Sequence, residues 1–385
     1  MARPGPLAVA ADVVTALGDG IAATFTALRE GRSGVARVEA FDPTPYGADA
    51  AAPLPAGTVP PPGEGPTRVE TPHGARLDRV ARAVHDAARA GDLPREALGL
   101  YVAVGVVDSP PQDVEPALAA SRGADGHFDL GAFFAGGFRS IHPHWPLRML
   151  GNVVVGQLAA ELDVRGDNLV LAAEADAGVR AFAEAAEALA AGAVLAALVA
   201  GVSDTLGPAA LLRASMRGTP GLVLGEGAGA FVLETDASVS ARGARPLGRL
   251  AGSATAFGAS DAGPGPAAET LEQVARAALD EAGRRPDEVG LVVVEGQSAE
   301  EAAARRALFP GRTDLAVVAP AVALGHLLAA APAVGSAVAL AALSTGEAPS
   351  TAGGRPRALA RGRVALVLGS GHAGGAGALV WEGVR

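Results

Sequence analysis

A short pattern that occurs twice constrains the fold of this chain more than any other feature. Residues 223–234 (VLGEGAGAFVLE) and 367–382 (VLGSGHAGGAGALVWE) both run from an apolar strand through a glycine-rich turn to a second strand with an acidic end. A chance match of two glycine-rich hairpins is the alternative. The length of 385 residues favours duplication, because single hydrophobic cores stop growing near 250–300 residues. We therefore predict two related halves, over residues 1–240 and 241–385.

Apolar strand patterns alternate with helical patterns along both halves. This alternation predicts an α/β protein whose sheets are largely parallel and lie between layers of helices. We expect strands over 7–14, 98–107, 168–172, 195–202, 289–294 and 315–318, strand pairs over 221–235 and 363–382, and helices over 21–29, 77–90, 112–121, 151–162, 178–191, 266–282, 300–308 and 324–343.

The apolar run over residues 323–343 contains His326, Pro332 and Ser336, so it predicts a buried helix rather than a membrane span. No targeting segment stands out at the N-terminus, and we predict a cytoplasmic protein that does not associate with membranes.

Several residue types are missing or rare in ways that exclude whole classes of chemistry. The chain has no cysteine, which excludes disulfides, thiolate nucleophiles and cysteine-ligated metals. All 31 basic residues are arginine, and the absence of lysine excludes Schiff-base chemistry and a P-loop. A net charge of −10 argues against nucleic-acid binding, which needs a basic surface.

Two further motifs suggest a cofactor or a metal, and each has a simpler explanation. Gly369, Gly371 and Gly374 have the spacing of a dinucleotide-binding turn, but a strand follows them where that site needs a helix. His142 and His144 could be metal ligands, but no carboxylate is near them in sequence, which favours a loop. We predict neither a cofactor nor a metal site.

The junction between the predicted strand 168–172 and the helix that follows it is the natural position for a nucleophile. Backbone N–H groups are free at the start of a helix and can stabilise an anion there. The junction offers only small residues and two carboxylates, Glu174 and Asp176. The two carboxylates either cap the helix dipole, or one of them shapes a pocket.

The order of these features resembles the β-ketoacyl synthase family over essentially the whole chain. The matching motifs are Val13-Val14-Thr15-Ala16-Leu17-Gly18, Gly31-Arg32-Ser33-Gly34 with Phe41-Asp42, Asn152, Gly156, Gly166, Asn168-Leu169, Gly225-Glu226-Gly227-Ala228-Gly229 with Leu233-Glu234, Ala241-Arg242-Gly243-Ala244, Gly325-His326 and Gly371–Gly375. The resemblance implies the thiolase-like fold, a duplicated α/β/α/β/α sandwich.

The resemblance also implies that the family's catalytic residues are largely lost. The family uses an acylated cysteine, two histidines that act in decarboxylation and enolate stabilisation, and a supporting lysine. The matching positions here are Ala175, Glu295 and His326, and Ala321. Only His326 is retained, so this chain alone is not expected to catalyse condensation, and we assign no catalytic residue to it.

Family members without the catalytic residues resemble the chain length factor of type II polyketide synthases. The resemblance implies a heterodimer with an active, cysteine-containing ketosynthase, in which this chain completes the tunnel for a polyketide carried by acyl carrier protein. His326 and the short length are similar to partner subunits of highly reducing or polyene-forming systems. Since this chain is acidic, carrier docking is expected to fall to the partner.

The resemblance implies two sets of residues for this role. The partner interface is expected near residues 153–158 and 168–189, and the tunnel wall near residues 106–118 and 128–138. The candidate tunnel and interface residues are Val106, Val107, Val114, Leu118, Phe133, Phe134, Phe138 and Glu174. The three phenylalanines are either ordinary anchors or plugs of the tunnel.

Two other classes of function stay open. Glu295 and His326 could activate water in a hydrolase or acyltransferase if they converge in a pocket. Alternatively, the chain could be a degenerate homodimeric scaffold with no synthase partner.

Overall fold

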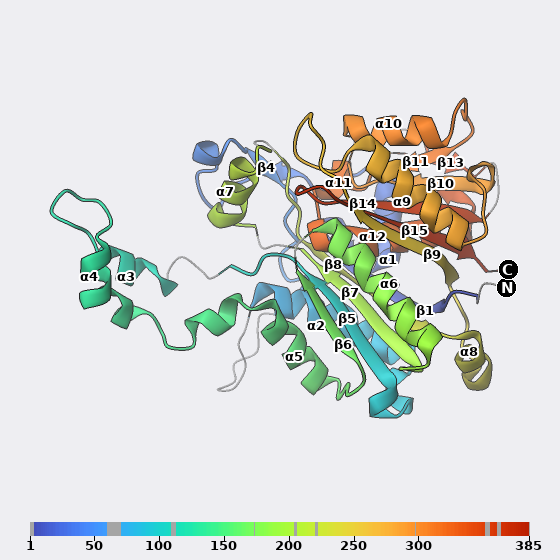
Figure 1. Ribbon diagram of the computed structural model, residues 1–385, viewed down its shortest axis with the longest axis horizontal. Helices are drawn as coiled ribbons and strands as arrows, with labels where there is room; N and C mark the ends of the chain where they lie inside the picture. The colour runs from blue at the N-terminus through green and yellow to red at the C-terminus, as the bar shows by residue number, and fades with distance from the viewer. Residues whose placement is uncertain are drawn as a thin grey trace.

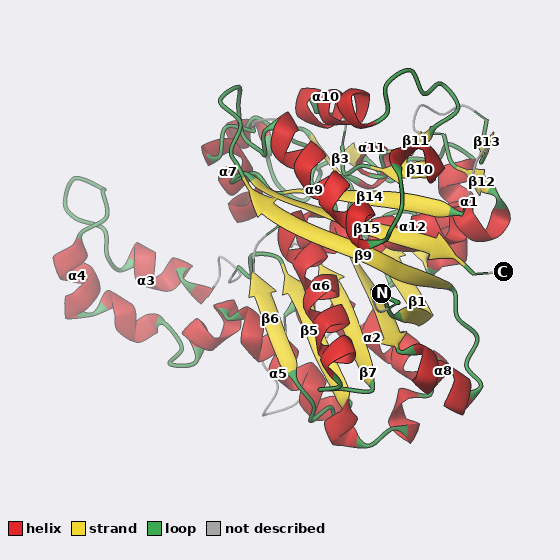
Figure 2. Cartoon of the chain, turned by 45° about the vertical axis from the view of Figure 1, so that its right-hand side comes forward, coloured by secondary structure: helices red, strands yellow, loops and turns green. Residues whose placement is uncertain are grey.

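A single mixed sheet runs through the molecule in the order β11-β10-β14-β15-β9-β1-β8-β7-β5-β6 (Figure 2). The computed structural model describes residues 4–59, 71–108, 113–172, 174–203, 206–219, 222–296, 298–350, 355–359 and 363–384. The sheet strands are β1 (Leu7–Thr15), β5 (Leu98–Val104), β6 (Asn168–Ala172), β7 (Ala196–Val202), β8 (Gly227–Glu234), β9 (Gly248–Phe257), β10 (Val289–Val293), β11 (Ala316–Val318), β14 (Val364–Ser370) and β15 (Gly375–Gly383).

The sheet consists of two halves with the same topology. In the first half β6, β5 and β7 run parallel, β8 is antiparallel to β7, and β1 is antiparallel to β8. In the second half β11, β10 and β14 run parallel, β15 is antiparallel to β14, and β9 is antiparallel to β15. The halves join where β1 pairs with β9 at Leu7 and Ala8. This repetition supports the predicted duplication. The expectation of largely parallel sheets is wrong, because the five pairings from β14 through β15, β9, β1 and β8 to β7 are antiparallel.

Helices lie on both outer faces and in the middle of the molecule (Figure 1). On one outer face α2 packs on β1, β7 and β8, and α5 packs on α2. In the middle, α6 contacts strands of both halves, and so does α12. On the other outer face α9 packs on β9, β14 and β15, with α10 against it. These helices span Pro72–Ala87 (α2), Gly151–Glu161 (α5), Ala175–Ala191 (α6), Ala268–Glu281 (α9), Ala299–Leu308 (α10) and Ala331–Thr345 (α12).

The remaining helices are short or lie at the periphery. They are α1 (Ile21–Arg29), α3 (Glu115–Ala119), α4 (Leu130–Ala135), α7 (Pro208–Met216), α8 (Asp236–Arg242) and α11 (Ala321–Leu324), and the short strands are β2 (Gly18–Asp19), β3 (Ala36–Arg37), β4 (Ala50–Ala51), β12 (Glu347–Ala348) and β13 (Arg357–Ala358). The predicted boundary at residues 240/241 falls within α8, and the two residue ranges stay a prediction.

Two expectations about single elements need correction, and one strand was missed. Residues 221–235 do not form a strand pair: within the part of this segment that the structure describes, only β8 is a strand, and it pairs with β7 and β1. The predicted helix over 324–343 starts later, because Gly325 and Leu328 adopt positive φ angles of 66° and 46°, and α12 begins at Ala331. Strand β9 was not predicted at all.

The central helix α12 is apolar enough to be mistaken for a membrane span. Residues 328–345 meet that criterion by length and composition, but 78% of this segment is buried inside the fold. The segment lies between the two halves of the sheet, which explains why it is apolar all round. The expectation of a buried helix is confirmed, and a cytoplasmic location stays a prediction.

Three aromatic side chains form the centre of the core, where the two halves and the middle layer meet. Phe182 of α6, Phe231 of β8 and Trp381 of β15 are buried, with ring centroids 5.2–5.8 Å apart. The Trp381 indole N–H donates to the Ser336 hydroxyl of α12 over 2.8 Å. Since only 4% of residues are aromatic, these three side chains supply much of the aromatic side-chain volume packed between the halves.

Residues 113–150 form an arm that extends away from the body of the molecule (Figure 1). The arm carries α3 and α4, and Arg148 binds Asp113 across its base over 2.9 Å. Large apolar side chains are exposed along it: Leu118, Phe128, Leu130, Phe134, Phe138, Leu147, Met149 and Leu150. Folded monomers rarely expose a continuous apolar segment of this kind.

Candidate functional site

Ala175, the position that would hold a nucleophile, is the first residue of α6 and is fully buried. Glu174 precedes it as the N-cap residue, but its side chain makes no capping hydrogen bond. Asp176 lies in the first turn of α6, where a carboxylate complements the helix dipole. Asp176 therefore has the position for the helix-dipole role, whereas the Glu174 side chain makes no capping hydrogen bond.

Glu174 instead bridges two segments that are far away in the sequence. Its carboxylate accepts hydrogen bonds from the backbone N–H of His372 and from the Arg217 guanidinium, and it lies 3.2 Å from Nδ1 of His372. Burial raises the pKa of Glu174, but hydrogen bonds from His372 and the charges of His372 and Arg217 outweigh burial, so the pKa lies below its usual value. The hydrogen bond with Glu174 in turn raises the pKa of His372. The carboxylate of Glu174 is thus held as an anion.

The glycine-rich turn between β14 and β15 allows this close approach. A Cβ atom on Gly371 would lie 2.6 Å from the Asp176 carboxylate, and one on Gly377 would lie 2.6 Å from Cβ of Val179. Glycine at these positions therefore lets the turn pack directly on the first turns of α6.

Glu295 and His326 converge from β10 and from the segment after α11. Glu295 follows β10, and its Oε1 atom lies 3.6 Å from Nδ1 of His326. Among the described residues, neither carboxylate oxygen of Glu295 has a hydrogen-bond partner. The backbone N–H of His326 donates to the Val223 carbonyl over 2.7 Å, and the His326 carbonyl accepts from Gly225 over 3.0 Å. The glycine motif of the first half thus holds the histidine of the second.

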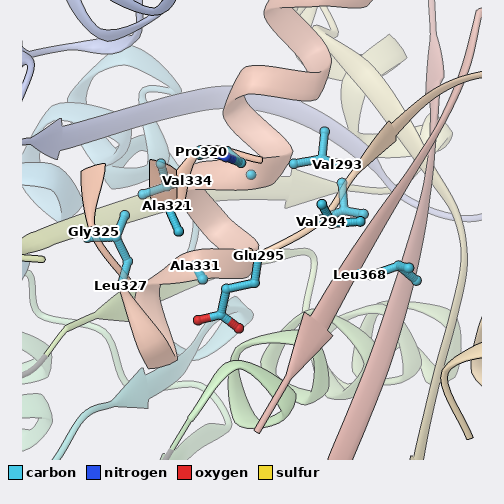
Figure 3. Close-up of a pocket in the computed structure, with 12 residues that line it drawn as sticks. Val293, Val294, Glu295, Pro320, Ala321, Gly325, Leu327, Ala331, Val334 and Leu368 are labelled. Carbon is cyan, nitrogen blue, oxygen red and sulfur yellow. The ribbon is translucent and has the colours of Figure 1, made fainter. Parts of the chain in front are cut away.

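Ala321 completes this group at the start of α11. Its backbone N–H donates to the Glu295 carbonyl over 3.3 Å. Glu295, Ala321 and Leu327 line a small void of about 10 Å³ (Figure 3), which has room for about one water molecule. The structure therefore brings together Glu295, Ala321 and His326, as the sequence suggested.

Glu295 also lines a larger cavity of about 310 Å³. It lies between the glycine turn, the segment around His326 and the start of α10. Its lining residues are Thr219, Leu222, Pro264, Gly265, Pro266, Glu295, Gly296, Ser298, Glu300, Glu301, His326, Ser370, Gly371 and His372. Burial raises the pKa of Glu301, and the charge of Glu295 adds to this shift. Burial likewise raises the pKa of Asp176, with the charges of Glu174 and Glu295 adding to it.

Sequence reasoning missed three residues of this site: Arg217, Glu301 and His372. His372 lies within the glycine turn that was singled out, so the motif gave a signal for its position but not for its role. Glu301 belongs to a capping box with Ser298, which is a recognisable pattern. Arg217 follows α7 and reaches Glu174 only through the tertiary fold, and no local pattern identifies it.

The site lacks the parts that acyl transfer needs. Ala175 offers no nucleophile. The His372 N–H, which points toward the start of α6 and could stabilise an oxyanion, already donates to the anionic Glu174. Glu295 adds a second buried carboxylate. The same occupied N–H group weakens the case for a hydrolase, although Glu295 and His326 are as close as that alternative requires.

The candidate tunnel residues lie mainly in or near the arm, apart from the start of α6 (Figure 1). Val106 and Val107 follow β5, and Val107 is buried, while Val114 at the base of the arm is partly buried. Leu118, Phe134 and Phe138 are exposed, whereas Phe133 is partly buried. Phe133 lies at the centre of a ring cluster, 5.4–6.5 Å from the centroids of Phe128, Phe134 and Phe138. None of the described ring contacts or hydrogen bonds joins these phenylalanines to Glu174.

His142 and His144 also lie in the arm, where their rings pack edge to face with centroids 5.3 Å apart. Among the residues that the structure describes, no group of three or more histidine, aspartate or glutamate side chains is arranged to hold a metal ion.

Comparison with known proteins identifies the family. Residues 247–355 match the family described as "Beta-ketoacyl synthase, C-terminal domain". The chain is similar to a "Putative polyketide beta-ketoacyl synthase 2" of Streptomyces coelicolor, with 31% identity over 71% of this chain and 73% of the relative. It is also similar to the "Actinorhodin polyketide putative beta-ketoacyl synthase 2" of the same organism, with 29% identity over 94% of both chains.

The fold agrees with this relationship. The structure titled "The ishigamide ketosynthase/chain length factor" superimposes with a TM-score of 0.82 over the full length of both chains, at 23% identity. The chain belongs to the β-ketoacyl synthase family and has its thiolase-like fold. Within the family, both of these relatives carry the name polyketide beta-ketoacyl synthase 2.

Proposed function

We propose that this chain is a non-condensing subunit that pairs with an active, cysteine-containing ketosynthase and sets the length of the polyketide that the pair makes. One observation carries the proposal. The position that matches the family's acylated cysteine is Ala175, and the anionic Glu174 beside it already accepts the backbone N–H of His372. A member of this family with such a site contributes shape and contacts rather than chemistry. By analogy with its relatives, this role belongs to antibiotic biosynthesis.

The edge of the sheet supports a partner interface. Among the strands that the structure describes, β6 is the last of the sheet and pairs only with β5, and none of its side chains is fully buried. Free sheet edges are usually short, charged or covered, because they expose unpaired backbone groups. β6 is flanked by α5 and α6, and the three elements overlap the ranges predicted for the interface, residues 153–158 and 168–189.

The arm supports the same interface. Its exposed apolar side chains need a cover, and an obligate interface of about 2,000 Å² or more would provide one. A ketosynthase that receives the arm would bring Phe133, Phe134 and Phe138 next to its own acyl chain. We propose that these side chains, with Val106, Val107, Val114 and Leu118, line or close the tunnel.

Co-expression with an intact ketosynthase encoded beside this chain tests whether the two proteins form a complex. We expect a one-to-one complex by native mass spectrometry. Phe134→Ser in the arm should weaken the complex at least tenfold, while Phe257→Ser, an equally exposed phenylalanine on β9, should leave it intact. A monomer, a homodimer or equal effects of the two substitutions would contradict the proposed interface.

Substitutions at Phe133 test whether its ring cluster closes the tunnel. If its cluster of rings closes the tunnel, Phe133→Ala should lengthen the product and Phe133→Trp should shorten it, as measured by mass spectrometry of the chains released from the reconstituted complex. An unchanged product profile with an intact complex would mean that these phenylalanines are only packing anchors.

The type of polyketide is part of the proposal. The retained His326 favours a highly reducing or polyene-forming system over an aromatic one. Reconstitution with reductive partners should then give reduced or conjugated chains, and unreduced poly-β-ketone products would overturn this assignment. Because the chain is acidic, we propose that the acyl carrier protein docks on the ketosynthase partner.

A further inference from the structure

The side chain of Glu174 is bound in the way that a protein binds a separate carboxylate ligand. Its Oε1 atom accepts a hydrogen bond from the Arg217 guanidinium, and its Oε2 atom accepts one from the backbone N–H of His372. Nδ1 of His372 lies 3.2 Å from the same Oε2 atom. Each oxygen therefore has a donor of its own, and the charge of Arg217 strengthens one of these hydrogen bonds.

The donors come from segments outside helix α6. Arg217 follows α7, and His372 belongs to the turn between β14 and β15. Glu174 precedes α6 with an extended backbone (φ −126°, ψ −158°), and its side chain makes no capping hydrogen bond. The carboxylate therefore serves the donors of two remote segments and not its own helix. Among the described residues, no other carboxylate forms an ion pair with Arg217.

The carboxylate is enclosed, but its donors border a cavity. The Glu174 side chain is only 6% exposed, so water competes little for its hydrogen bonds. A Cβ atom on Gly371 would lie 3.3 Å from Oε2 of Glu174, so the glycine turn packs directly on the carboxylate. Gly371 and His372 also line the cavity of about 310 Å³. This cavity is the route by which a free anion would reach the donors.

The charges around this position accommodate one anion and oppose a second. Burial raises the pKa of Glu174, but the hydrogen bonds from His372 and the charges of His372 and Arg217 outweigh it. The pKa of Asp176, in contrast, is raised by burial, and the charges of Glu174 and Glu295 add to this shift. An external anion would meet the same repulsion as long as Glu174 is in place.

We propose that Arg217 and His372 form a carboxylate-binding site that is closed by an internal ligand, the side chain of Glu174. The site takes a small aliphatic carboxylate. In the unaltered chain Glu174 excludes such a ligand twice, because it fills the space and because it carries the same charge. The inference uses contacts within this chain alone and does not depend on the proposed role in chain-length control.

Chemical rescue of the Glu174→Ala variant tests the inference. The substitution removes a methylene-carboxylate group, which acetate matches in size and charge, and it leaves the donors in place. We expect sodium acetate to bind the full-length variant with one-to-one saturation in isothermal titration calorimetry at pH 7 and constant ionic strength, and not to bind the unaltered chain. Acetamide has the same shape but no charge, so it should bind at least tenfold more weakly. Adding Arg217→Gln to Glu174→Ala should also weaken acetate binding at least tenfold.

Two further variants control for the loss of a carboxylate and for the shape of the site. Glu184→Ala removes a carboxylate that pairs with Arg180 on the same helix. That pair is far more exposed than Glu174, so Glu184→Ala should create no acetate site. Glu174→Gln removes the charge but still fills the space, and it should bind no acetate either.

Several outcomes would overturn the inference. They are the absence of saturable acetate binding to a folded Glu174→Ala variant, equal affinity for acetate and acetamide, an affinity that Arg217→Gln leaves unchanged, and equal acetate binding to the unaltered chain. If Glu174→Ala does not fold in buffer, its refolding from urea is followed by circular dichroism. Acetate should then restore the native spectrum and acetamide should not. Equal effects of the two compounds, or no effect of either, would overturn the inference.

Discussion

Restoring a cysteine at Ala175 should not by itself restore a reactive nucleophile. A thiol at the start of α6 would gain from the helix dipole, but it would lie next to the anionic Glu174. We therefore predict that the Ala175→Cys variant reacts slowly, and that adding Glu174→Gln to it accelerates the reaction. Glutamine keeps the size of the side chain, so access to the thiol is the same in both variants.

The magnitude follows from the charges around the thiol. At an effective dielectric constant of 20 and a distance of roughly 6 Å, two unit charges interact by about 3 kcal/mol, equivalent to about two pKa units. Arg217 and His372 offset part of the Glu174 charge, so we take one to two units as the rise in the thiol pKa. Each unit lowers the thiolate fraction about tenfold, while the higher nucleophilicity of a more basic thiolate recovers roughly threefold. The net expectation is an acceleration of about threefold to tenfold on adding Glu174→Gln.

Alkylation by iodoacetamide at pH 7, followed by intact-mass spectrometry, measures this ratio. The unaltered chain has no cysteine and serves as the blank. Equal rates for the Ala175→Cys variant with and without Glu174→Gln would refute the argument, because they would mean that Glu174 does not control the electrostatics of this position. A slower double variant would refute it as well.

Three further predictions concern stability. Trp381→Ala should lower the free energy of unfolding by about 3–5 kcal/mol in urea titrations, because it removes a buried indole and its hydrogen bond to Ser336; a loss below 1 kcal/mol would contradict the central role of the aromatic cluster. Gly178→Ala should lower the free energy of unfolding by about 1–3 kcal/mol, since its Cβ would lie 2.7 Å from the Ala329 carbonyl oxygen. A Cβ at Gly156 in α5 meets nothing within 4 Å, so Gly156→Ala should be neutral or stabilising. Equal effects of the two substitutions would argue against this packing. Burial lowers the pKa of His73 to about 3, with the charges of Arg76 and Arg213 contributing. His73 is neutral in the folded chain and takes up a proton near pH 6.5 in the unfolded chain, so its contribution to stability is present above pH 6.5 and is lost as the pH falls toward 3. The melting temperature of His73→Gln should therefore fall less over that pH range than that of the unaltered chain. An unchanged pH dependence would rule His73 out as the cause.

The sequence predicted the fold through its strongest local signals. The repeated glycine-rich segments correspond to β8 and β15, which occupy equivalent positions in the two halves. The long apolar runs, such as β7, β10 and α12, were recognisable because their residues are buried almost throughout. Strand β9 was missed because its second half has polar and exposed residues, and local patterns carry little signal for such a strand.

The site was only partly predictable for a physical reason. Glu174, Ala175, Glu295, Ala321 and His326 lie next to strand ends or helix starts, where position in the motif indicates position in space. The contacts of Glu174 span 43 and 198 residues along the chain, and only the packing of the two halves on each other creates them. That one of the two carboxylates shapes a pocket stays a prediction, and the pairing of Glu174 with Arg217 and His372 was not available from local sequence.

Elongation assayed with separated and combined subunits tests the central claim most directly. The chain is purified alone, the neighbouring ketosynthase is purified alone, and the two are compared with the co-expressed complex in the presence of malonyl-loaded acyl carrier protein. We predict chain elongation of defined length only when both proteins are present, and none from this chain alone. Elongation of the same length by the ketosynthase without this chain, or condensation by this chain on its own, would contradict the account.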